Sequence, residues 1–137
     1  VLDIGTGSGI LGIAAVLLCA AGALGVDIDP MCVRTAQEHA DLNAVENRFT
    51  AVAGNLADKA GGTSAIIPAN IVADAIIKLA PAIPPLLRQQ GSFIASGIIA
   101  ERSEEVKKAL QQAGLAITGA HTKNGWAALV ARHSAQA

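Results

Sequence analysis

Short apolar runs alternate with longer amphipathic segments along the chain, and each run ends at a polar or glycine residue. Short apolar runs bounded by turn residues are typical of strands whose two faces are both buried. The pattern therefore predicts seven strands: Val1–Ile4, Ala23–Asp27, Phe49–Ala53, Ala65–Asn70, Ser92–Gly97, Leu115–Ala120 and Trp126–Arg132.

Helix signals fill most of the intervals between these runs. Asp29 followed by Pro30 is a strong start signal, because aspartate caps the free N–H groups and proline suits the first turn. Four helical segments are expected: Ser8–Ala20, ended by Gly22; a helix from Pro30 to Leu42, stopped at Asn43; Ile71–Gln89, divided by its prolines into two short helices; and Glu101–Ala113, closed by Gly114.

The order of these elements predicts an α/β fold. Strands that alternate with helices form a parallel sheet with helices on both faces. Only the short turn at Lys123, Asn124 and Gly125 separates the last two strands, so these must form an antiparallel hairpin. A chain of 137 residues is long enough to bury a core as one domain. We expect a mostly parallel seven-stranded sheet with an antiparallel C-terminal hairpin.

Composition narrows the class of protein. Hydrophobic residues make up 52% of the chain and aromatic residues only 2%, so alanine, valine, isoleucine and leucine must build the core. The formal net charge is -1 and the basic residues are scattered, which argues against direct nucleic-acid binding. The apolar run over residues 10–21 is too short to span a bilayer, and no targeting segment is visible. We expect a cytoplasmic protein without a membrane partner.

The cysteines and histidines do not form a metal-binding pattern. Cys19 and Cys32 lie inside predicted helices without paired spacing, which favours small buried thiols in a reducing compartment. His39, His121 and His133 are far apart in the sequence and form no ligand cluster. No metal site is therefore expected, and His121, at the end of a strand, is expected to be structural.

The first strand runs directly into glycines at every second position, Gly5, Gly7 and Gly9. Glycines let the backbone turn sharply and approach a ligand closely, while the following helix points its free N–H groups at the same space. Asp27 ends the next strand, where a carboxylate can accept hydrogen bonds from two ribose hydroxyls. The stretch predicts a site for a nucleotide-type cofactor.

Two cofactors fit this spacing. Gly7, Gly9 and Gly12 satisfy the dinucleotide fingerprint, with Asp27 at roughly the expected distance, so an NAD-binding domain is one interpretation. Asp3 argues against it, because a carboxylate at the strand end would repel a pyrophosphate. The same carboxylate suits a cationic amino group such as that of S-adenosylmethionine, either directly or by ordering the glycine loop.

Asparagines end two further strands. Asn55 and Asn70 follow the third and fourth apolar runs, so they fall at the carboxyl ends of parallel strands, where ligands of such sheets bind. Asn55 could meet the edge of an adenine, although an ordinary turn role is equally open. We expect Asn70 to position a reacting amine through its side-chain carbonyl or a neighbouring backbone carbonyl; a structural asparagine that bonds backbone groups at the strand end is the alternative. Trp126 opens a hairpin strand and is expected to be core.

Together these residues resemble one family, the methyltransferases of large-subunit ribosomal protein eleven, which are class I S-adenosylmethionine-dependent enzymes with a Rossmann-like fold. The resemblance runs nearly end to end. It rests on Asp3-Ile4-Gly5-Thr6-Gly7-Ser8-Gly9-Ile10-Leu11, Gly25-Val26-Asp27-Ile28-Asp29-Pro30, Ala69-Asn70-Ile71-Val72-Ala73, Leu79-Ala80-Pro81, Ser96-Gly97-Ile98 and Trp126-Ala127-Ala128-Leu129-Val130-Ala131-Arg132.

The resemblance implies methylation of lysine and N-terminal amines on that ribosomal protein, with S-adenosylmethionine as cofactor. By the family pattern, Gly5, Asp27 and Asn70 contact the cofactor. The full set expected at the cofactor is Asp3, Gly5, Thr6, Gly7, Gly9, Asp27, Ile28, Asn55 and Asn70, with Asn70 also the catalytic residue. A class I methyltransferase with another acceptor, such as RNA or a small molecule, and a Rossmann module without enzymatic activity remain alternatives.

The residues after Asn70 bear on the acceptor. Related amide and base methyltransferases carry an Asn-Pro-Pro-Tyr type motif there, whereas this chain has Ile71, Val72 and Ala73. Without a ring to stack on a planar group, an alkyl amine is favoured. Ala65 and Pro68 depart from the family pattern, and Pro68 is expected to interrupt its strand. Because the chain starts within a strand, we expect residues 1–137 to be a methyltransferase domain that lacks an upstream cofactor-contacting threonine and substrate-recognition domain.

Overall fold

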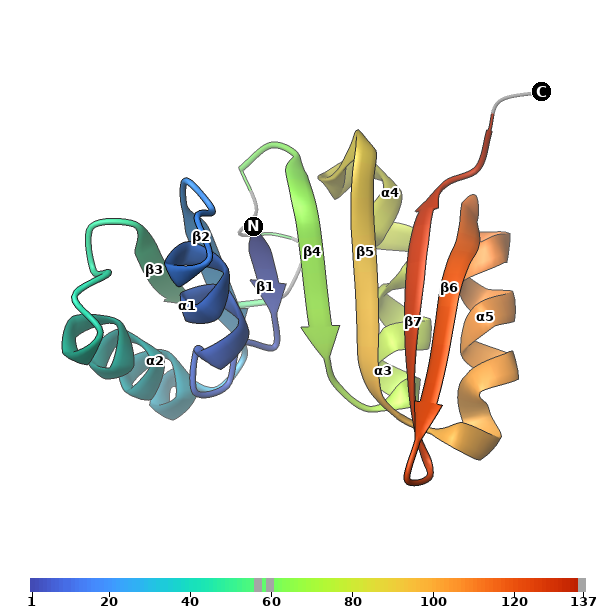
Figure 1. The fold of residues 1–137 in the computed structure, drawn as a ribbon, viewed down its shortest axis with the longest axis horizontal. Coiled ribbons are helices and arrows are strands. Elements are labelled where there is room, and N and C mark those ends of the chain that lie inside the picture. Colours follow the sequence, from blue (N-terminus) through green and yellow to red (C-terminus); the bar gives the residue numbers. More distant parts are fainter. Residues whose placement is uncertain (56–57, 59–60, 136–137) are drawn as a thin grey trace. The chain divides into compact units, whose positions relative to one another are not determined.

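The structure is a computed structural model that describes residues 1–55, 58 and 61–135. The chain divides into two compact units, Val1–Gly61 and Gly62–Ala137, whose elements are labelled in Figure 1. The glycine-rich loop predicted after the third strand lies partly outside the described residues. No helix in the described part of the chain is long and apolar enough to cross a membrane.

The first unit is a three-stranded parallel sheet with two helices that pack on it and on each other. Its strands lie in the order β3-β2-β1. Phe49 is fully buried against alanines of the second helix, whose small side chains let that helix approach the sheet closely. The elements are β1 (Leu2–Ile4), α1 (Ile10–Leu17), β2 (Ala23–Asp27), α2 (Pro30–Leu42) and β3 (Phe49–Ala53).

The end of α1 corrects two predictions. Cys19 adopts a left-handed backbone conformation (φ 80°), and the N–H of Ala20 donates to the carbonyl of Ala15 over 2.8 Å. This Schellman arrangement ends the helix at Leu17, before the predicted end and without Gly22. Cys19 consequently lies exposed beyond the helix, and Cys32 in α2 is half-buried, so the expectation of buried thiols is wrong.

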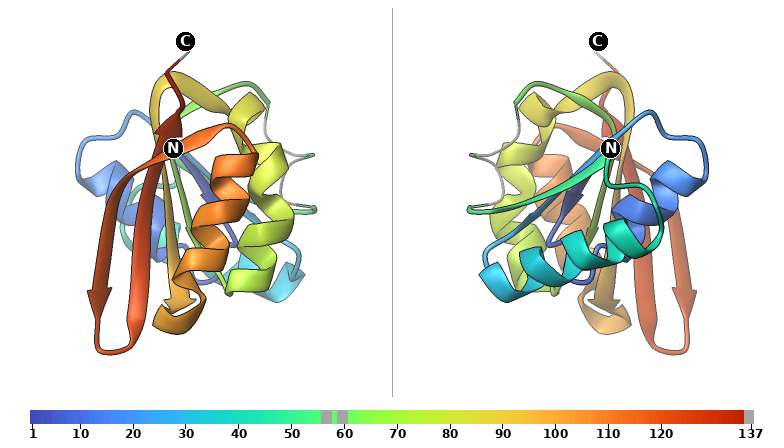
Figure 2. Two further views of the ribbon diagram at one scale, coloured as in Figure 1. Left: turned by 90° about the vertical axis from the view of Figure 1, so that its right-hand side faces the viewer. Right: turned by 90° about the vertical axis from the view of Figure 1, so that its left-hand side faces the viewer.

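The second unit holds four strands in the order β4-β5-β7-β6. β4 and β5 are parallel, whereas β7 is antiparallel to both of its neighbours. Figure 2 shows α3 and α5 side by side, and Arg102 links them by an ion pair with Asp74 at 2.8 Å. The elements are β4 (Ser64–Asn70), α3 (Ala73–Leu79), η1 (Ala80–Ala82), α4 (Ile83–Leu86), β5 (Leu87–Ile99), η2 (Ala100–Arg102), α5 (Ser103–Gln112), β6 (Leu115–Lys123) and β7 (Trp126–His133).

The strands confirm the predicted class, an α/β fold with mostly parallel pairing and an antiparallel C-terminal hairpin. The long proline-containing segment differs from its prediction, because the chain turns extended at Leu87 and β5 takes up residues expected to be helical. Pro68 does not interrupt β4, where it is buried and pairs with Ile94. Only alternate residues of a parallel strand bond to a given neighbour, so one missing N–H leaves the ladder continuous.

Candidate active site

The glycine loop joins β1 to α1 through three left-handed residues. Gly5, Gly7 and Gly9 have φ angles of 69°, 55° and 83°, a region that side chains with a Cβ rarely adopt. The N–H groups of Gly5 and Thr6 both donate to the carbonyl of Val26, at 2.8 and 3.0 Å. The loop is therefore fastened to the end of β2, and backbone rather than side chains forms its surface at Gly5 and Gly7.

Asp3 lies beneath this loop and is 1% exposed. Its Oδ2 accepts hydrogen bonds from the hydroxyl of Thr6 at 2.7 Å and from the N–H of Gly12 at 3.0 Å. Burial raises the pKa of Asp3, the two hydrogen bonds pull that pKa down, and the charge of Asp27 adds to the rise. Of the two roles expected for Asp3, its contacts are those of a residue that orders the loop.

Asp27 lies half-exposed at the end of β2, and backbone N–H groups engage both of its oxygens. Gly7 donates to Oδ2 at 2.9 Å and Asp29 donates to Oδ1 at 3.0 Å. Each carboxylate oxygen has a second acceptor position, so the carboxylate is oriented and can still bind hydroxyl groups. The next residue, Ile28, is 73% exposed. Asn55 lies one residue beyond Gly54, after the end of β3, and its carbonyl accepts a hydrogen bond from the N–H of Asp58 at 3.1 Å.

Close packing accounts for Gly12, the third glycine of the dinucleotide pattern. A Cβ at Gly12 would lie 2.7 Å from Cε2 of Phe49 and 3.3 Å from Oδ2 of Asp3. Gly12 therefore lets α1 pack on β3 and donate its N–H to a buried carboxylate. That carboxylate stands beneath the first turn of α1, where a pyrophosphate would be repelled.

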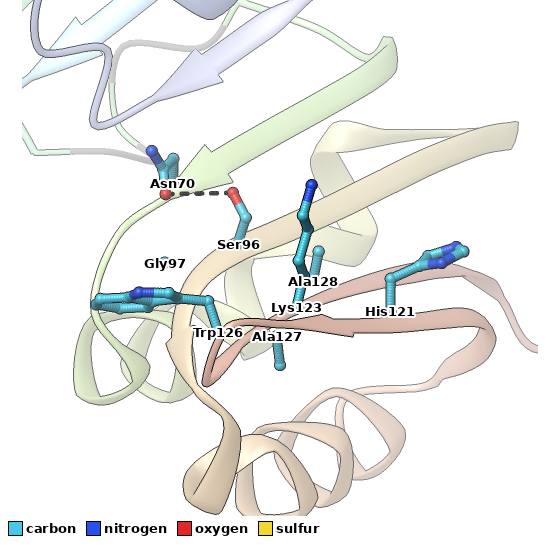
Figure 3. A pocket seen from close by; sticks show the side chains of 8 residues that line it. All are labelled: Asn70, Ser96, Gly97, His121, Lys123, Trp126, Ala127 and Ala128. Carbon is cyan, nitrogen blue, oxygen red and sulfur yellow. Dashed lines mark hydrogen bonds between the residues drawn. The ribbon is translucent and has the colours of Figure 1, made fainter.

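Asn70, at the end of β4, lines a cavity of about 450 Å³ within the second unit. Figure 3 shows Asn70 and Trp126 toward one end of the cavity and His121 toward the other. The hydroxyl of Ser96 donates to Oδ1 of Asn70 at 3.2 Å. No carboxylate belongs to the lining among the described residues, which consists of Asn70, Ser96, Gly97, His121, Lys123, Trp126, Ala127 and Ala128.

Trp126 corrects another prediction, because its side chain is 57% exposed in this cavity instead of packed in the core. The alternation along β7 explains the position: Ala127, Leu129 and Ala131 are buried on one face, so Trp126 belongs to the other. Residues 126–131 are all apolar, so the sequence did not show which face of β7 is buried. The contributions of Ser96 and Lys123 could not be predicted either, since nothing local to them marks a cavity.

The described residues contain no group of three histidine, cysteine or acidic side chains that could hold a metal ion. Each unit holds its own candidate site: the glycine loop with Asp27 in the first, and the Asn70 cavity in the second. Each site stands at the carboxyl end of parallel strands of its own unit, the usual location of ligands in α/β sheets.

Comparison with solved structures defines the class. The chain has the class I methyltransferase fold: a ribosomal protein L11 methylase from Lactobacillus delbrueckii subsp. bulgaricus matches with a TM-score of 0.94 and 30% identity, over 98% of this chain and 69% of that one. An RNA methyltransferase from Salinibacter ruber shares the fold at 19% identity and a TM-score of 0.74, over 94% of this chain and 76% of that one.

The family follows from the sequence matches. The family model described as ribosomal protein L11 methyltransferase (PrmA) matches residues 1–134, and the chain belongs to this family. The family's protein from Heliobacterium modesticaldum is 45% identical over 134 residues, 98% of this chain and 42% of that protein. The Bacillus subtilis relative is 39% identical over 96% of this chain and 42% of its own length. The chain thus spans about two fifths of these relatives. An NAD-binding domain is not favoured.

Proposed function

We propose that this protein is an S-adenosylmethionine-dependent N-methyltransferase that acts on lysine and N-terminal amines of ribosomal protein L11. The observation that carries the proposal is Asn70, a hydrogen-bonding residue at a strand end, which lines an otherwise largely apolar cavity in a chain of this family. Residues 1–137 serve in this proposal as the S-adenosylmethionine-binding methyltransferase domain, and the cytoplasm, where ribosomal proteins are made, is the expected location.

The first unit fits the cofactor. Asp27 is oriented by two backbone N–H groups and offers further acceptor positions to ribose hydroxyls. The surface at Gly5 and Gly7 carries no Cβ, so a ligand can approach the backbone of the loop. The exposed Ile28 and the amide of Asn55 are proposed to contact the adenine, with Asp3 and Thr6 holding the loop from beneath. S-adenosylmethionine supplies an electrophilic methyl group on a sulfonium.

The acceptor amine must lose its proton before it can react. A lysine side chain has an ordinary pKa of about 10.4, so nearly all of it is charged at neutral pH. A cavity whose surface is mostly apolar, with the cation of Lys123 and no carboxylate among the described lining residues, disfavours the charged ammonium. No general base is needed in this scheme, because the amine enters as the neutral form or releases its proton to water.

Asn70 and Trp126 have different proposed roles: Asn70 binds the acceptor nitrogen, and Trp126 contacts the alkyl chain that carries it. Oδ1 of Asn70 accepts an N–H of the amine, which turns the nitrogen lone pair toward the methyl group. The indole of Trp126 offers a wide apolar wall for the alkyl chain of a lysine. Ile71, Val72 and Ala73 follow Asn70 without an aromatic ring, so Trp126 is the aromatic side chain among the described residues that line this cavity. Alignment of this kind can supply about 7 to 11 kcal/mol of the barrier.

Two measurements on the full-length protein test the function. Calorimetry with S-adenosylhomocysteine is expected to show binding that Asp27→Ala weakens by about 10- to 100-fold, the loss of about 1.5 to 3 kcal/mol from hydrogen bonds to a charged group. Asp41→Ala, which removes an exposed carboxylate from α2, is the charge-matched control and should bind normally.

The acceptor is tested with labelled S-adenosylmethionine and purified ribosomal proteins and RNA. The label is expected in L11, on amines, and lost with Asn70→Ala even at S-adenosylmethionine concentrations that saturate this variant. Label that enters only RNA or small molecules would replace the proposed substrate, and absence of S-adenosylhomocysteine binding would remove the proposed function altogether.

A further inference from the structure

A β-bulge lies directly beside Asn70. In the antiparallel pair of β5 and β7, Ala95 pairs with Leu129 and Ile98 pairs with Ala127, so two residues of β5 face the single residue between them on β7. These two residues are Ser96 and Gly97. Gly97 has a φ of 76°, a left-handed conformation that favours glycine. Bulges of this kind redirect side chains at the edges of functional sites.

The bulge leaves room for the carboxamide of Asn70. On the other edge of β5, Ser96 pairs with Asn70 in the parallel ladder. A Cβ at Gly97 would lie 2.7 Å from Oδ1 of Asn70 and 3.1 Å from the carbonyl oxygen of Ile71. Oδ1 therefore occupies the space that any side chain at position 97 would need.

Two hydrogen bonds from this segment hold Asn70 and the residue after it. The hydroxyl of Ser96 donates to Oδ1 of Asn70 at 3.2 Å, as the dashed line in Figure 3 shows. The N–H of Ile71 donates to the carbonyl of Ser96, also at 3.2 Å. Side chain and backbone are thus both tied to the bulge, at the point where the chain leaves β4.

We propose that Ser96 and Gly97 are positioning residues that fix the carboxamide of Asn70 with its oxygen toward the acceptor amine; this rests on the proposed function. The last torsion of an asparagine side chain is broad, so an untethered carboxamide turns readily. Its NH₂ group would then face the amine, where it cannot accept an N–H. With one lone pair of Oδ1 taken by Ser96, the other accepts from the amine.

The chemistry of methyl transfer determines which of the successive transfers Ser96 can assist. The lone pair of the amine nitrogen forms a bond to the methyl carbon while the carbon–sulfur bond breaks and its electron pair stays on sulfur. After the first and second transfers the methylated ammonium releases a proton to water, and after a third the quaternary ammonium has none to release. A neutral primary or secondary amine has an N–H to donate to Oδ1, and a neutral tertiary amine has none. Ser96 should therefore assist the first and second transfers but not a third.

The test uses Ser96→Ala, Ser96→Thr and Asn70→Ala in the full-length protein, with methylation of L11 as the readout. Ser96→Ala is expected to lower kcat about 5-fold while the affinity for S-adenosylhomocysteine stays within 2-fold. Ser96→Thr, which keeps the hydroxyl, should restore kcat to within 2-fold. Ser92 lies on the same strand and its Oγ accepts a hydrogen bond from Arg132 at 3.1 Å, so Ser92→Ala is the matched control and should leave kcat unchanged.

Two further comparisons separate positioning from general stability. In an Asn70→Ala background, Ser96→Ala should cause no additional loss, because the group it orients is gone. On L11 whose amines have been reductively dimethylated, the Ser96→Ala variant and the parent protein should transfer methyl groups at the same rate.

Three results would overturn the inference. They are an unchanged kcat for Ser96→Ala, a further fall in kcat of full size when Ser96→Ala is added to Asn70→Ala, and an equal fall in kcat on dimethylated L11. If Asn70→Ala itself leaves amine methylation unchanged, or the parent does not methylate L11, the proposed function has failed instead.

Discussion

The glycine loop and the Asn70 cavity are built in opposite ways. In the loop, a carboxylate that is 1% exposed receives two hydrogen bonds, and the surface offered to a ligand is backbone. In the cavity, the side chains of Trp126, Lys123 and His121 are exposed, and the hydroxyl of Ser96 holds the carboxamide of Asn70. Substitutions beneath the loop should therefore lower the free energy of unfolding, and substitutions in the cavity should change the kinetics of methyl transfer.

The largest expected effect is loss of stability in Asp3→Ala. The substitution leaves the hydroxyl of Thr6 and the N–H of Gly12 buried without an acceptor, at about 1 to 3 kcal/mol for each such group. Because removal of a poorly solvated carboxylate offsets part of this cost, we expect about 2 to 4 kcal/mol less stability in urea denaturation. Asp41→Ala is the exposed control, and a change below about 0.5 kcal/mol for Asp3→Ala would contradict this account of the loop.

The next largest effect is expected from a substitution in the bulge, and it should appear in kcat. Gly97→Ala places a Cβ 2.7 Å from Oδ1 of Asn70 at a φ of 76°, so the carboxamide has to move. We expect kcat for L11 methylation to fall about 20-fold, equivalent to about 1.8 kcal/mol, with S-adenosylhomocysteine affinity within about 3-fold. Gly119→Ala is the control, because a Cβ there meets only side-chain atoms of Val130, the nearest at 3.5 Å. A loss of cofactor binding as large as the loss of kcat would show that the bulge supports the fold rather than Asn70.

Asp3 also makes stability depend on pH. Its pKa is raised in the folded state, so protonation favours folding: this contribution is fully present below the unfolded value of about 3.9 and is lost as pH rises through the higher folded value. The stability of the parent relative to Asp3→Asn should fall over that window, by at most about 1.4 kcal/mol per unit of pKa difference. Denaturation of both proteins at matched pH values measures it, and parallel curves would mean that the pKa of Asp3 is not raised.

The two regions also differ in how far their sequence predicted them. The loop is contiguous, so Gly5, Gly7 and Gly9 could be read from spacing alone. The carboxylates near the ends of the first two strands, Asp3 within β1 and Asp27 at the end of β2, could be read in the same way. The cavity combines the end of β4, a bulge in β5 and a hairpin, and no local pattern announces a register shift between Ala95 and Ile98. The end of α1 was missed for a related reason, since nothing in the sequence marks the non-glycine residue Cys19 as left-handed.

Trp126 gives the smallest expected effect and the sharpest contrast with Asp3. The indole is 57% exposed, so Trp126→Ala should change the free energy of unfolding by less than about 0.5 kcal/mol. Burial of one CH₂ of a lysine alkyl chain against the indole is worth about 0.8 kcal/mol, which predicts a rise of about 2- to 5-fold in KM for L11. Trp126→Phe keeps an aromatic wall and should recover part of this. Stability losses comparable to those of Asp3→Ala would place Trp126 in the core, and an unchanged KM would remove it from the acceptor site.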